Sequence, residues 1–438
     1  MKLYSTNNKG HIVNLKEAVL RGLPPDNGLY MPTEIPLLPD GFIETIENYD
    51  IKELAFEVCK TLFNGFLPLS DLEKIVNQAV SFPAPLKKLN EELFILELFH
   101  GPSLAFKDFG ARFMAQLMSY FNQNESKELV ILVATSGDTG GAVASGFYKT
   151  EGIKVVILYP SGKVSPLQEK QLTTLGHNIT ALEIDGTFDD CQAIVKKAFL
   201  DPDLINFIRL TSANSINIAR LIPQSFYYFE AYKQAPKGHP INYCIPSGNF
   251  GNLTAGLFAH KMGMPAHQFI AATNANDIVP QYLETGKYLP KPSVRTLSNA
   301  MDVGNPSNFN RMLDYFYTET NGSTWNNMKE KITGYAFNDV DTAEAMREIK
   351  DKYDYIIDPH GAVGHLAIKK YKEENRFKST NVLLETAHPA KFLGDVERIL
   401  DEKIEIPLPL KELEGKTKSS IKMDKHYSSF KEWIKMNY

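Results

Sequence analysis

A lysine set among aromatic residues is the first feature of the sequence whose chemistry stands out. The segment FHGPSLAFKDFG runs from Phe99 to Gly110, and Lys107 lies between Phe106 and Asp108. Aromatic neighbours can keep water from an amine. Desolvation disfavours the charged form and makes the amine a better nucleophile for a carbonyl. Most lysines instead extend their charged end into solvent, so the segment predicts a reactive amine only if other features support it.

A glycine-rich turn offers a place for an anion. IPSGNFGN runs from Ile245 to Asn252, follows an apolar run and precedes a helical pattern. Gly248 and Gly251 permit backbone angles closed to other residues. Consecutive amides can then point inward at the start of a helix, where the helix dipole favours negative charge. The spacing matches neither a dinucleotide fingerprint nor a P-loop, so the turn favours a small phosphorylated ligand over a nucleotide. A plain tight turn is the alternative.

A second turn of this kind, ATSGDTGGAVASGF, covers residues 134–147. Ser136, Thr139 and nearby amides are suited to grip a carboxylate or a phosphate. The alternative is an ordinary helix start capped by Asp138 or Thr139. Two anion sites together with a desolvated lysine are more specific than any one of the three segments.

A third polar cluster ends the apolar run NVLLET, within NVLLETAHPAKF at residues 381–392. The hydroxyl of Thr386 is suited to hydrogen-bond the nitrogen of an aromatic ring. His388 precedes a proline-led turn and is expected to brace that turn. Glu385 is expected to be structural rather than a general base.

Strand and helix signals place these segments at the ends of buried strands. From Leu93 onward, short runs rich in Val, Ile and Leu alternate with longer helical segments, such as residues 109–121. Such runs are typical of strands buried on both faces of a parallel sheet. The alternation predicts an open α/β architecture with ligands beyond the carboxyl ends of the strands. The expected strands cover residues 93–98, 128–134, 153–159, 178–184, 241–246, 268–273 and 381–386.

The first 85 residues are expected to be mainly helical, with a few short extended pieces. Residues 14–22 have apolar side chains at helical spacing and end in glycine. Ser70 and Glu73 have the spacing of a capping box at a helix start. The proline-containing segment Phe82 to Leu86 is typical of a linker.

Composition limits the class of protein. The 438 residues are 43% hydrophobic and 23% charged, enough for a large core and two or three domains. A net charge of -5 disfavours binding to nucleic acid or anionic membranes. Cys59, Cys191 and Cys244 are expected to be buried free thiols. The N-terminus lacks the apolar run of a signal peptide, and no apolar run approaches ~20 residues. We therefore expect a soluble cytoplasmic protein without a metal site.

Taken together, the motifs resemble those of the threonine synthase family. The resemblance rests on SLAFKDF around Lys107, TSGDTGGA around Asp138, PSGNFG around Gly248, ETAHPAK around Thr386, and the stretch NLKEAVLRGLPPDNGLYMP at residues 14–32. It extends from Met1 to about Asp401. It implies a fold-type II pyridoxal-phosphate (PLP) enzyme with two open, mostly parallel α/β domains and a small, mainly helical N-terminal domain. The domains implied are 1–85, then 86–130 with 238–438 for the large cofactor-binding unit, and 131–237 for the small unit.

The resemblance also implies roles for individual residues. Lys107 would carry PLP as a Schiff base, and Thr386 would contact the pyridine nitrogen. The loop near the substrate carboxylate and the cofactor 3-hydroxyl would comprise Ser136, Gly137, Asp138 and Thr139. The PLP phosphate would rest on Gly248, Asn249, Phe250, Gly251 and Asn252. Many relatives in the wider fold have Asn where Asp138 stands. Substrate phosphate would need a second anion site, for which Lys163, Thr139 and Arg112 are the candidates.

The reaction implied is the last step of threonine biosynthesis. O-phospho-L-homoserine loses phosphate from Cγ and takes up water at Cβ, giving L-threonine, with Lys107 removing the α proton. A serine/threonine dehydratase or cysteine synthase shares the fold, and the N-terminal segment and the SGDTGG loop argue against it. A non-catalytic phosphate-binding α/β protein and a structural protein with a degenerate site are further alternatives. The expected state is a monomer or a homodimer.

Overall fold

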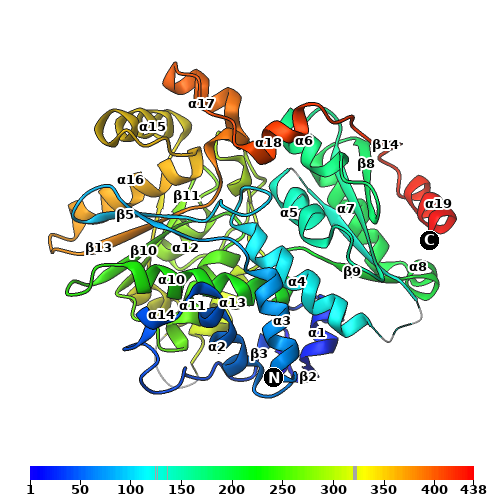
Figure 1. The fold of residues 1–438 in the computed structure, drawn as a ribbon, viewed down its shortest axis with the longest axis horizontal. Helices are drawn as coiled ribbons and strands as arrows, with labels where there is room; N and C mark the ends of the chain where they lie inside the picture. Colours follow the sequence, from blue (N-terminus) through cyan, green and yellow to red (C-terminus); the bar gives the residue numbers. More distant parts are fainter. Residues whose placement is uncertain (124, 126, 136, 319–322) are drawn as a thin grey trace.

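Two largely parallel β-sheets and one small antiparallel sheet organise the chain (Figure 1). The structure is a computed structural model and describes residues 1–123, 125, 127–135, 137–318 and 323–438. The parallel sheets confirm the α/β class expected from the alternating apolar runs and helical segments.

The larger sheet contains the strands that lead into two of the segments singled out in the sequence, the turn at residues 245–252 and the segment at residues 381–392. Its order is β12-β11-β10-β13-β5-β4 within the described residues, and only β4 pairs antiparallel, with β5. All residues of β10 and β13 are buried, which explains their apolar runs. The strands are β4 (Leu86–Lys88), β5 (Leu93–Glu97), β10 (Ile241–Pro246), β11 (Gln268–Thr273), β12 (Ile332–Ala336) and β13 (Thr380–Glu385).

Helices cover both faces of this sheet. Leu383 packs into the cluster that contains Val363 of α16, whereas Val382 and Leu384 pack into the cluster that contains Leu253 of α11. Successive residues of a strand face opposite sides, so a single buried run supplies both interfaces. The covering helices are α15 (Asp339–Tyr353) and α16 (Pro359–Glu374) on one face, and α10 (Phe226–Gln234) and α11 (Gly251–Lys261) on the other.

The smaller parallel sheet has the order β14-β8-β7-β6-β9. Val156 of β7 packs with Ile194 of α7 and Phe430 of α19, while the neighbouring Val155 faces the cluster that holds Val143 of α5. The elements are β6 (Leu129–Ala134), β7 (Ile153–Pro160), β8 (Ile179–Asp185), β9 (Arg209–Ser212), β14 (Ile421–Asp424), α5 (Asp138–Phe147), α6 (Pro166–Thr173), α7 (Phe188–Leu200) and α19 (Tyr427–Asn437).

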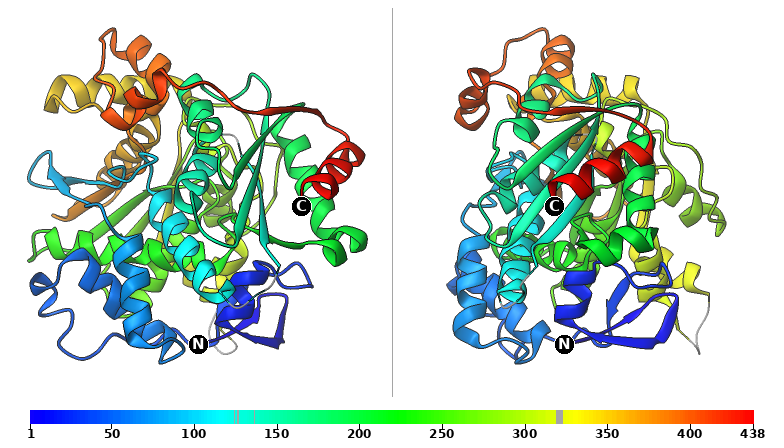
Figure 2. Two further views of the ribbon diagram at one scale, coloured as in Figure 1. Left: turned by 45° about the vertical axis from the view of Figure 1, so that its right-hand side comes forward. Right: turned by 90° about the vertical axis from the view of Figure 1, so that its right-hand side faces the viewer.

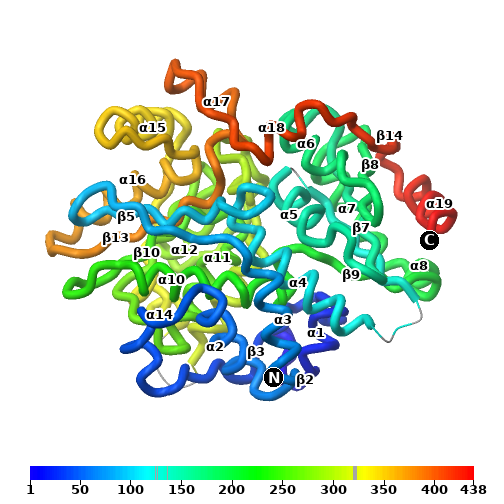
Figure 3. Tube along the Cα trace, in the orientation of Figure 1, coloured from blue at the N-terminus to red at the C-terminus, as the bar shows by residue number. Residues whose placement is uncertain are grey.

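The C-terminal segment crosses from the larger sheet to the smaller one (Figures 2 and 3). β14 pairs in parallel with β8 at the edge of the smaller sheet, and α19 packs beside α7. The sequence assigned all of 238–438 to the large unit, and for residues 421–437 this assignment is wrong. β14 is short and mostly exposed, so it lacks the apolar signal of a buried strand. The expected boundary at residue 130 also falls inside β6.

The N-terminal region contains a three-stranded antiparallel sheet that the sequence analysis described only as short extended pieces. The capping box expected at Ser70 is not formed, because α3 begins two residues earlier, with Pro68 at the cap position and no side-chain cap. Asp50 and Glu53 form a capping box at α2 instead. The elements are β1 (Lys2–Ser5), β2 (Asn8–Asn14), β3 (Tyr30–Pro32), α1 (Leu15–Arg21), α2 (Ile51–Phe63) and α3 (Leu69–Ala79).

Helix α4 (Lys107–Asn122) packs against both α3 and α5, between the N-terminal region and the smaller sheet. The three cysteines are free and buried, as expected. None of the helices in the described residues has the length and apolar character needed to cross a bilayer. The other helices are α8 (Pro202–Phe207), α9 (Ile218–Leu221), α12 (Ile278–Thr285), α13 (Phe309–Phe316), α14 (Thr324–Lys331), α17 (Leu393–Leu400) and α18 (Leu408–Glu414).

Candidate active site

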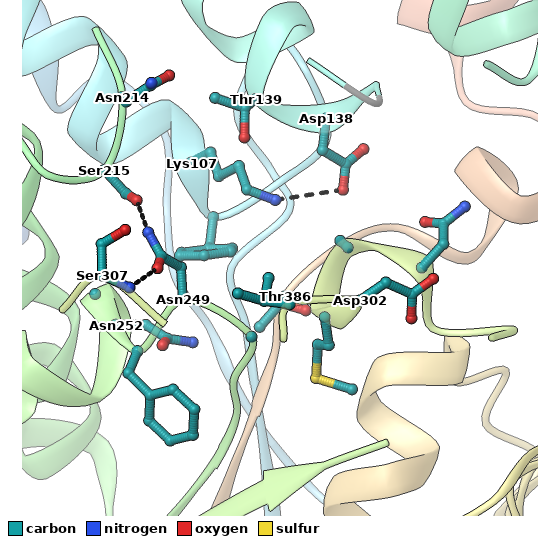
Figure 4. Close-up of a pocket in the computed structure, with 18 of the residues that line it drawn as sticks. Lys107, Asp138, Thr139, Asn214, Ser215, Asn249, Asn252, Asp302, Ser307 and Thr386 are labelled. Atoms are coloured by element: carbon teal, nitrogen blue, oxygen red, sulfur yellow. Dashed lines mark hydrogen bonds and ion pairs between the residues drawn. The ribbon is translucent and has the colours of Figure 1, made fainter. Parts of the chain in front are cut away.

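A cavity of about 300 Å³ lies at the carboxyl ends of the parallel strands. It brings together Lys107, Asp138, Thr386 and the turn at residues 248–252, which are distant in the sequence (Figure 4). We call residues 248–252 the glycine loop and residues 213–217, which follow β9, the serine loop. The position agrees with the general placement of ligands in open α/β sheets.

Backbone pairing places Lys107 beside the end of β13. The Phe106 amide donates to the Thr386 carbonyl at 2.9 Å, and the His388 amide donates to the Leu104 carbonyl at 3.0 Å. This short antiparallel contact fixes the start of α4, of which Lys107 is the first residue. The lysine therefore leaves a rigid helix end and points into the cavity (Figure 4).

The Lys107 amine is largely desolvated. Only 16% of its side chain is exposed, and its Nζ lies 5.2 Å from the centroid of the Phe106 ring. Burial lowers its pKa below the ordinary lysine value. The Asp138 carboxylate, 3.6 Å away, opposes this shift, while Lys391 and Arg220 add to it. A lowered pKa increases the fraction of neutral, nucleophilic amine, which is the property expected from the sequence.

Asp138 is held by three side chains rather than left free. Its Oδ1 accepts from Gln168 Nε2 at 2.8 Å and lies 3.0 Å from Lys391 Nζ, and its Oδ2 faces Lys107. Burial opposes ionisation of Asp138, but the two ammonium groups outweigh burial and hold its pKa below the ordinary value. Lys391 is fully buried and was not singled out in the sequence, although it ends the motif ETAHPAK.

The glycine loop presents backbone amides at the start of α11. The first intrahelical bond is donated by Thr254 to the Phe250 carbonyl, so the amides before Thr254 precede the helix ladder. Phe250 has φ 59°, a left-handed conformation that is uncommon for a non-glycine residue. A Cβ on Gly248 would lie 2.7 Å from Met301 Cα, so only glycine fits there. The loop thus has the features of an anion site.

Side chains of the glycine loop act as braces. Asn249 Nδ2 donates to Ser215 Oγ at 2.5 Å, and its Oδ1 accepts from the Ser307 amide at 2.6 Å (Figure 4). Asn252 Nδ2 donates to the Pro246 carbonyl, and its Oδ1 accepts from Ser247 Oγ. These asparagine side chains are committed to protein partners, which leaves the backbone of the loop to meet a ligand.

The other residues at the end of β13 divide as the sequence suggested. Thr386 lines the cavity. His388 Nδ1 accepts from the Ala390 amide at 3.1 Å, a helix-capping contact. Glu385 accepts from the Asp358 amide through Oε1 and is fully buried. Burial first, and then the nearby Asp358, raise the pKa of Glu385 well above the ordinary value.

The first turn of α5 contributes a second residue to the cavity besides Asp138. Thr139 lines the wall (Figure 4). Gly137 has φ 144°, and a Cβ there would lie 2.8 Å from the Gln168 side chain. Thr135 Oγ1 accepts from the Gly137 amide and stabilises this turn. Ser136 lies outside the described residues.

Two candidates for the substrate phosphate lie outside this cavity. Arg112 Nε and Nη2 donate to the carbonyls of Ala79 and Gln78, which ties α4 to the end of α3. Lys163 is exposed on the turn after β7. Neither is among the residues that line the cavity. The geometry of the cavity therefore gives no support to their assignment as phosphate ligands, because sequence proximity to a motif does not fix the direction in which a side chain points.

The cavity instead contains an arginine that the sequence analysis missed. Arg220 follows the serine loop, lines the cavity with Asn214 and Ser215, and is 2% exposed. Its Nη1 donates to the Ala213 carbonyl at 2.6 Å. Among the residues that the structure describes, it forms no ion pair, and its buried Nε has no hydrogen-bond partner. An arginine within the otherwise apolar stretch IARLIP was the available signal.

Comparison with known proteins places this arrangement in a family. A family described as "Pyridoxal-phosphate dependent enzyme" matches residues 74–385, and the families "Threonine synthase N terminus" and "Threonine synthase, C-terminal" match residues 2–80 and 361–434. The threonine synthase of Haemophilus influenzae is 46% identical over 411 residues, covering 93% of each chain. The chain belongs to the threonine synthase family.

Solved structures agree with this assignment. The crystal structure of threonine synthase from Escherichia coli superposes with a TM-score of 0.92 at 41% identity, covering 100% of both chains. The structure of PLP-bound threonine synthase from Brucella melitensis gives a TM-score of 0.93 at 33% identity, covering 100% of this chain and 99% of that one. A fungal L-serine ammonia-lyase, at 12% identity and a TM-score of 0.56, shares the fold alone.

The cofactor is therefore PLP, and the residues present fit it. A desolvated amine and the glycine loop line one cavity, which suits an aldehyde and a phosphate carried by one molecule. The tight contact at Gly248 and the left-handed Phe250 shape the loop for a group that approaches the backbone closely. Thr386 lines the same cavity and has a neutral hydroxyl.

Proposed function

We propose that this chain converts O-phospho-L-homoserine and water into L-threonine and phosphate. The observation that carries the proposal is the shared cavity of Lys107 and the glycine loop, in a chain whose relatives at 41–46% identity are named threonine synthase. A cytoplasmic location and a monomeric or homodimeric state remain predictions from the sequence.

Lys107 has two tasks in this proposal. Its Nζ would hold the cofactor aldehyde in the resting enzyme, and the glycine loop would hold the cofactor phosphate. PLP, when bound, supplies an electron sink for charge at the substrate Cα. With substrate bound, Nζ would remove the Cα proton and then a Cβ proton as phosphate leaves Cγ, and would deliver a proton to Cγ; water would supply the hydroxyl at Cβ, and a proton would return to Cα. Burial lowers the pKa of this amine, which favours its neutral, proton-accepting form.

Arg220 is the residue that we assign to the substrate phosphate. It is the cavity-lining cation without a carboxylate partner among the described residues, and burial lowers its pKa to about 10, which still leaves it charged at neutral pH. A guanidinium fits a phosphate better than an ammonium does, because its donors form a planar fork. Asn214 and Ser215 lie on the same wall and can add neutral donors.

The loop before α5 is assigned to the substrate carboxylate. Thr139 lies at the N-terminal end of α5, where the helix dipole and free amides favour an anion. The sequence-based assignment of Ser136 and Gly137 to the same group is retained. Asp138, which lies between two lysines, orients Lys107 and would accept a hydrogen bond from the 3-hydroxyl of the bound cofactor.

The deciding experiment follows the colour and the products of the purified protein. We expect absorption near roughly 410–420 nm, a spectral change when phosphohomoserine is added, and release of equal amounts of phosphate and threonine. Borohydride treatment followed by peptide mass spectrometry should place the cofactor on Lys107. Lys107→Ala should abolish turnover, whereas Lys163→Ala, a change to an exposed lysine outside the cavity, should not. Keto acid formed from threonine without phosphate release would instead indicate a dehydratase.

A further inference from the structure

Arg311 is a fully buried arginine that lies outside the cavity wall. It belongs to α13 and is 0% exposed. Its Nε and Nη2 donate to the Tyr30 carbonyl at 3.2 and 3.1 Å, Nη2 also donates to the Ile216 carbonyl at 2.6 Å, and Nη1 donates to Asn308 Oδ1 at 2.7 Å. One guanidinium thus joins the N-terminal sheet, the serine loop and the segment that precedes α13.

All of these partners are neutral. Within the described part of the chain, no carboxylate forms an ion pair with Arg311. Burying an unpaired charge is costly, and a side chain used only to fill space is normally apolar. What distinguishes the guanidinium is its planar fork of five donors, which can hold several acceptors in one fixed geometry.

The contacts continue from Arg311 to the glycine loop. Asn308 accepts from Arg311 through Oδ1, and its Nδ2 donates to the Ser215 carbonyl at 3.5 Å. Ser215 Oγ accepts from Asn249 at 2.5 Å, and Asn249 in turn accepts from the Ser307 amide, next to Asn308 (Figure 4). The hydrogen bonds therefore close into a ring formed by Ser215, Asn249 and the neighbouring residues 307–308. Arg311 is attached to this ring through Asn308.

The ring also touches the start of α11. A Cβ built on Gly251 would lie 3.3 Å from Asn308 Nδ2 and 3.8 Å from Ser215 Cβ. Asn308 and Ser215 therefore pack directly against the backbone of the glycine loop. The loop is held from this side by residues of the ring and from the other by Ala300 and Met301, against which Gly248 packs.

We propose that Arg311 is a positioning residue that holds the glycine loop and the serine loop in the geometry that binds phosphate. This inference rests on the proposed function, because the glycine loop is assigned there to the PLP phosphate. Amides that already face the ligand lose little conformational entropy on binding, so the ordering cost is met during folding. Through Tyr30, the N-terminal sheet becomes part of the cofactor site, although none of its residues lines the cavity.

Two substitutions separate the geometry of the fork from its charge. R311K keeps the charge but replaces the fixed fork by one flexible ammonium, and R311M removes all of the donors. R112K and R112M are the matched controls. Arg112 also donates to backbone carbonyls and joins the N-terminal region to α4, and its hydrogen bonds among the described residues go to residues 78–81 rather than to either loop.

The readouts are PLP binding to the apoprotein and hydrogen exchange of apoprotein amides. We expect both Arg311 variants to raise the PLP dissociation constant at least tenfold and to speed exchange at residues 213–217 and 249–252. The Arg112 variants should change the dissociation constant less than threefold, even where they lower the melting temperature as much. Amide hydrogen exchange should speed up nearly as much in R311K as in R311M, because both variants lose the planar fork of donors.

Several outcomes would overturn the inference. One is an unchanged PLP dissociation constant in both Arg311 variants, and another is an equal loss of PLP affinity in the Arg112 variants. If R311M does not fold, R311K decides; if neither folds, the role of Arg311 is global stability and the inference fails. Failure of the proposed function looks different, because the wild-type protein would then not bind PLP, while the exchange comparison would still report on Arg311.

Discussion

Lys391 Nζ lies 3.0 Å from Asp138 Oδ1, with 0% and 4% of the respective side chains exposed. The lysine follows β13 and the aspartate begins α5, so this buried ion pair joins the two parallel sheets at the cavity. Lys391 also donates to the Ser103 carbonyl at 2.6 Å and to Gln171 Oε1 at 3.1 Å. The pair is therefore fully hydrogen-bonded, as a buried charge requires.

Removing one partner of this pair should destabilise the protein more than removing both. Lys391→Met leaves Asp138 buried with Lys107 as its remaining cation, and we expect the free energy of unfolding to fall by about 3–5 kcal/mol at pH 7. Adding Asp138→Asn should recover part of that loss. Urea unfolding of the wild type, both single variants and the double variant measures the coupling energy. Additive losses would mean that the two side chains do not interact.

Arg220→Lys should weaken substrate use without loss of the cofactor. A hydrogen bond to a charged group is worth about 1.5–3 kcal/mol, so kcat/KM for phosphohomoserine should fall by roughly ten- to hundredfold. Inorganic phosphate should protect the wild-type site in competition assays and lose this effect in the variant. PLP absorbance should be retained. An unchanged kcat/KM would remove Arg220 from the phosphate site.

Gly248→Ala should disturb the glycine loop directly. The new Cβ would lie 2.7 Å from Met301 Cα and 3.1 Å from the Ala300 carbonyl oxygen, both backbone atoms, so one segment must move. We expect PLP affinity to fall at least tenfold, measured by titration of the apoprotein, with a stability loss of roughly 1–3 kcal/mol. Gly394→Ala is the control, because its added Cβ meets nothing within 4 Å. Equal PLP affinity in the two variants would contradict the proposed role.

Stability should fall as the pH drops below neutral. Burial lowers the pKa of His388 and that of His365 to about 4, from an ordinary value of 6.5. The unfolded chain therefore takes up protons near pH 6.5 while the folded protein does not. The stabilisation is complete above pH 6.5 and is lost as the pH falls towards 4, by up to about 1.4 kcal/mol per pH unit for each histidine.

His388→Asn isolates one of these contributions. Asparagine keeps an acceptor for the Ala390 amide but does not titrate, so the variant should lose less stability than the wild type between pH 7 and pH 5. Urea unfolding of the apoprotein at several pH values measures the difference. An identical pH dependence in both proteins would show that His388 does not contribute.

The buried strands were predictable because their signal is local. β10 and β11 have the bounds expected from the sequence, and β13 is shifted by one residue. Both faces of these strands are covered, so nearly every residue is apolar. β9, β12 and β14 were missed, because they are short strands with exposed or half-buried residues. Their strand character comes from pairing with a neighbour rather than from their own composition.

The site divides in the same way. Lys107, Thr386 and the glycine loop could be found from motifs, because amine, hydroxyl and glycine each have a chemistry that does not depend on distant partners. Arg112 and Lys163 lie outside the cavity, Arg220 and Lys391 were not singled out, and no role was assigned to Arg311. Whether a lysine or an arginine can bind a ligand depends on the residues packed around it, and these residues come from distant parts of the sequence.

The sequence by itself determined the chemical groups, the buried strands and the turns that follow them. Only the tertiary structure decided which groups meet: pairing of residues 104–106 with 386–388 sets Lys107 beside Thr386, and packing of α5 against the segment after β13 sets Asp138 between two lysines. The physical reason is the distance along the sequence over which each effect acts. Backbone preferences and apolar patterns act within a few residues, whereas burial and ion pairing depend on contacts between segments far apart in the chain.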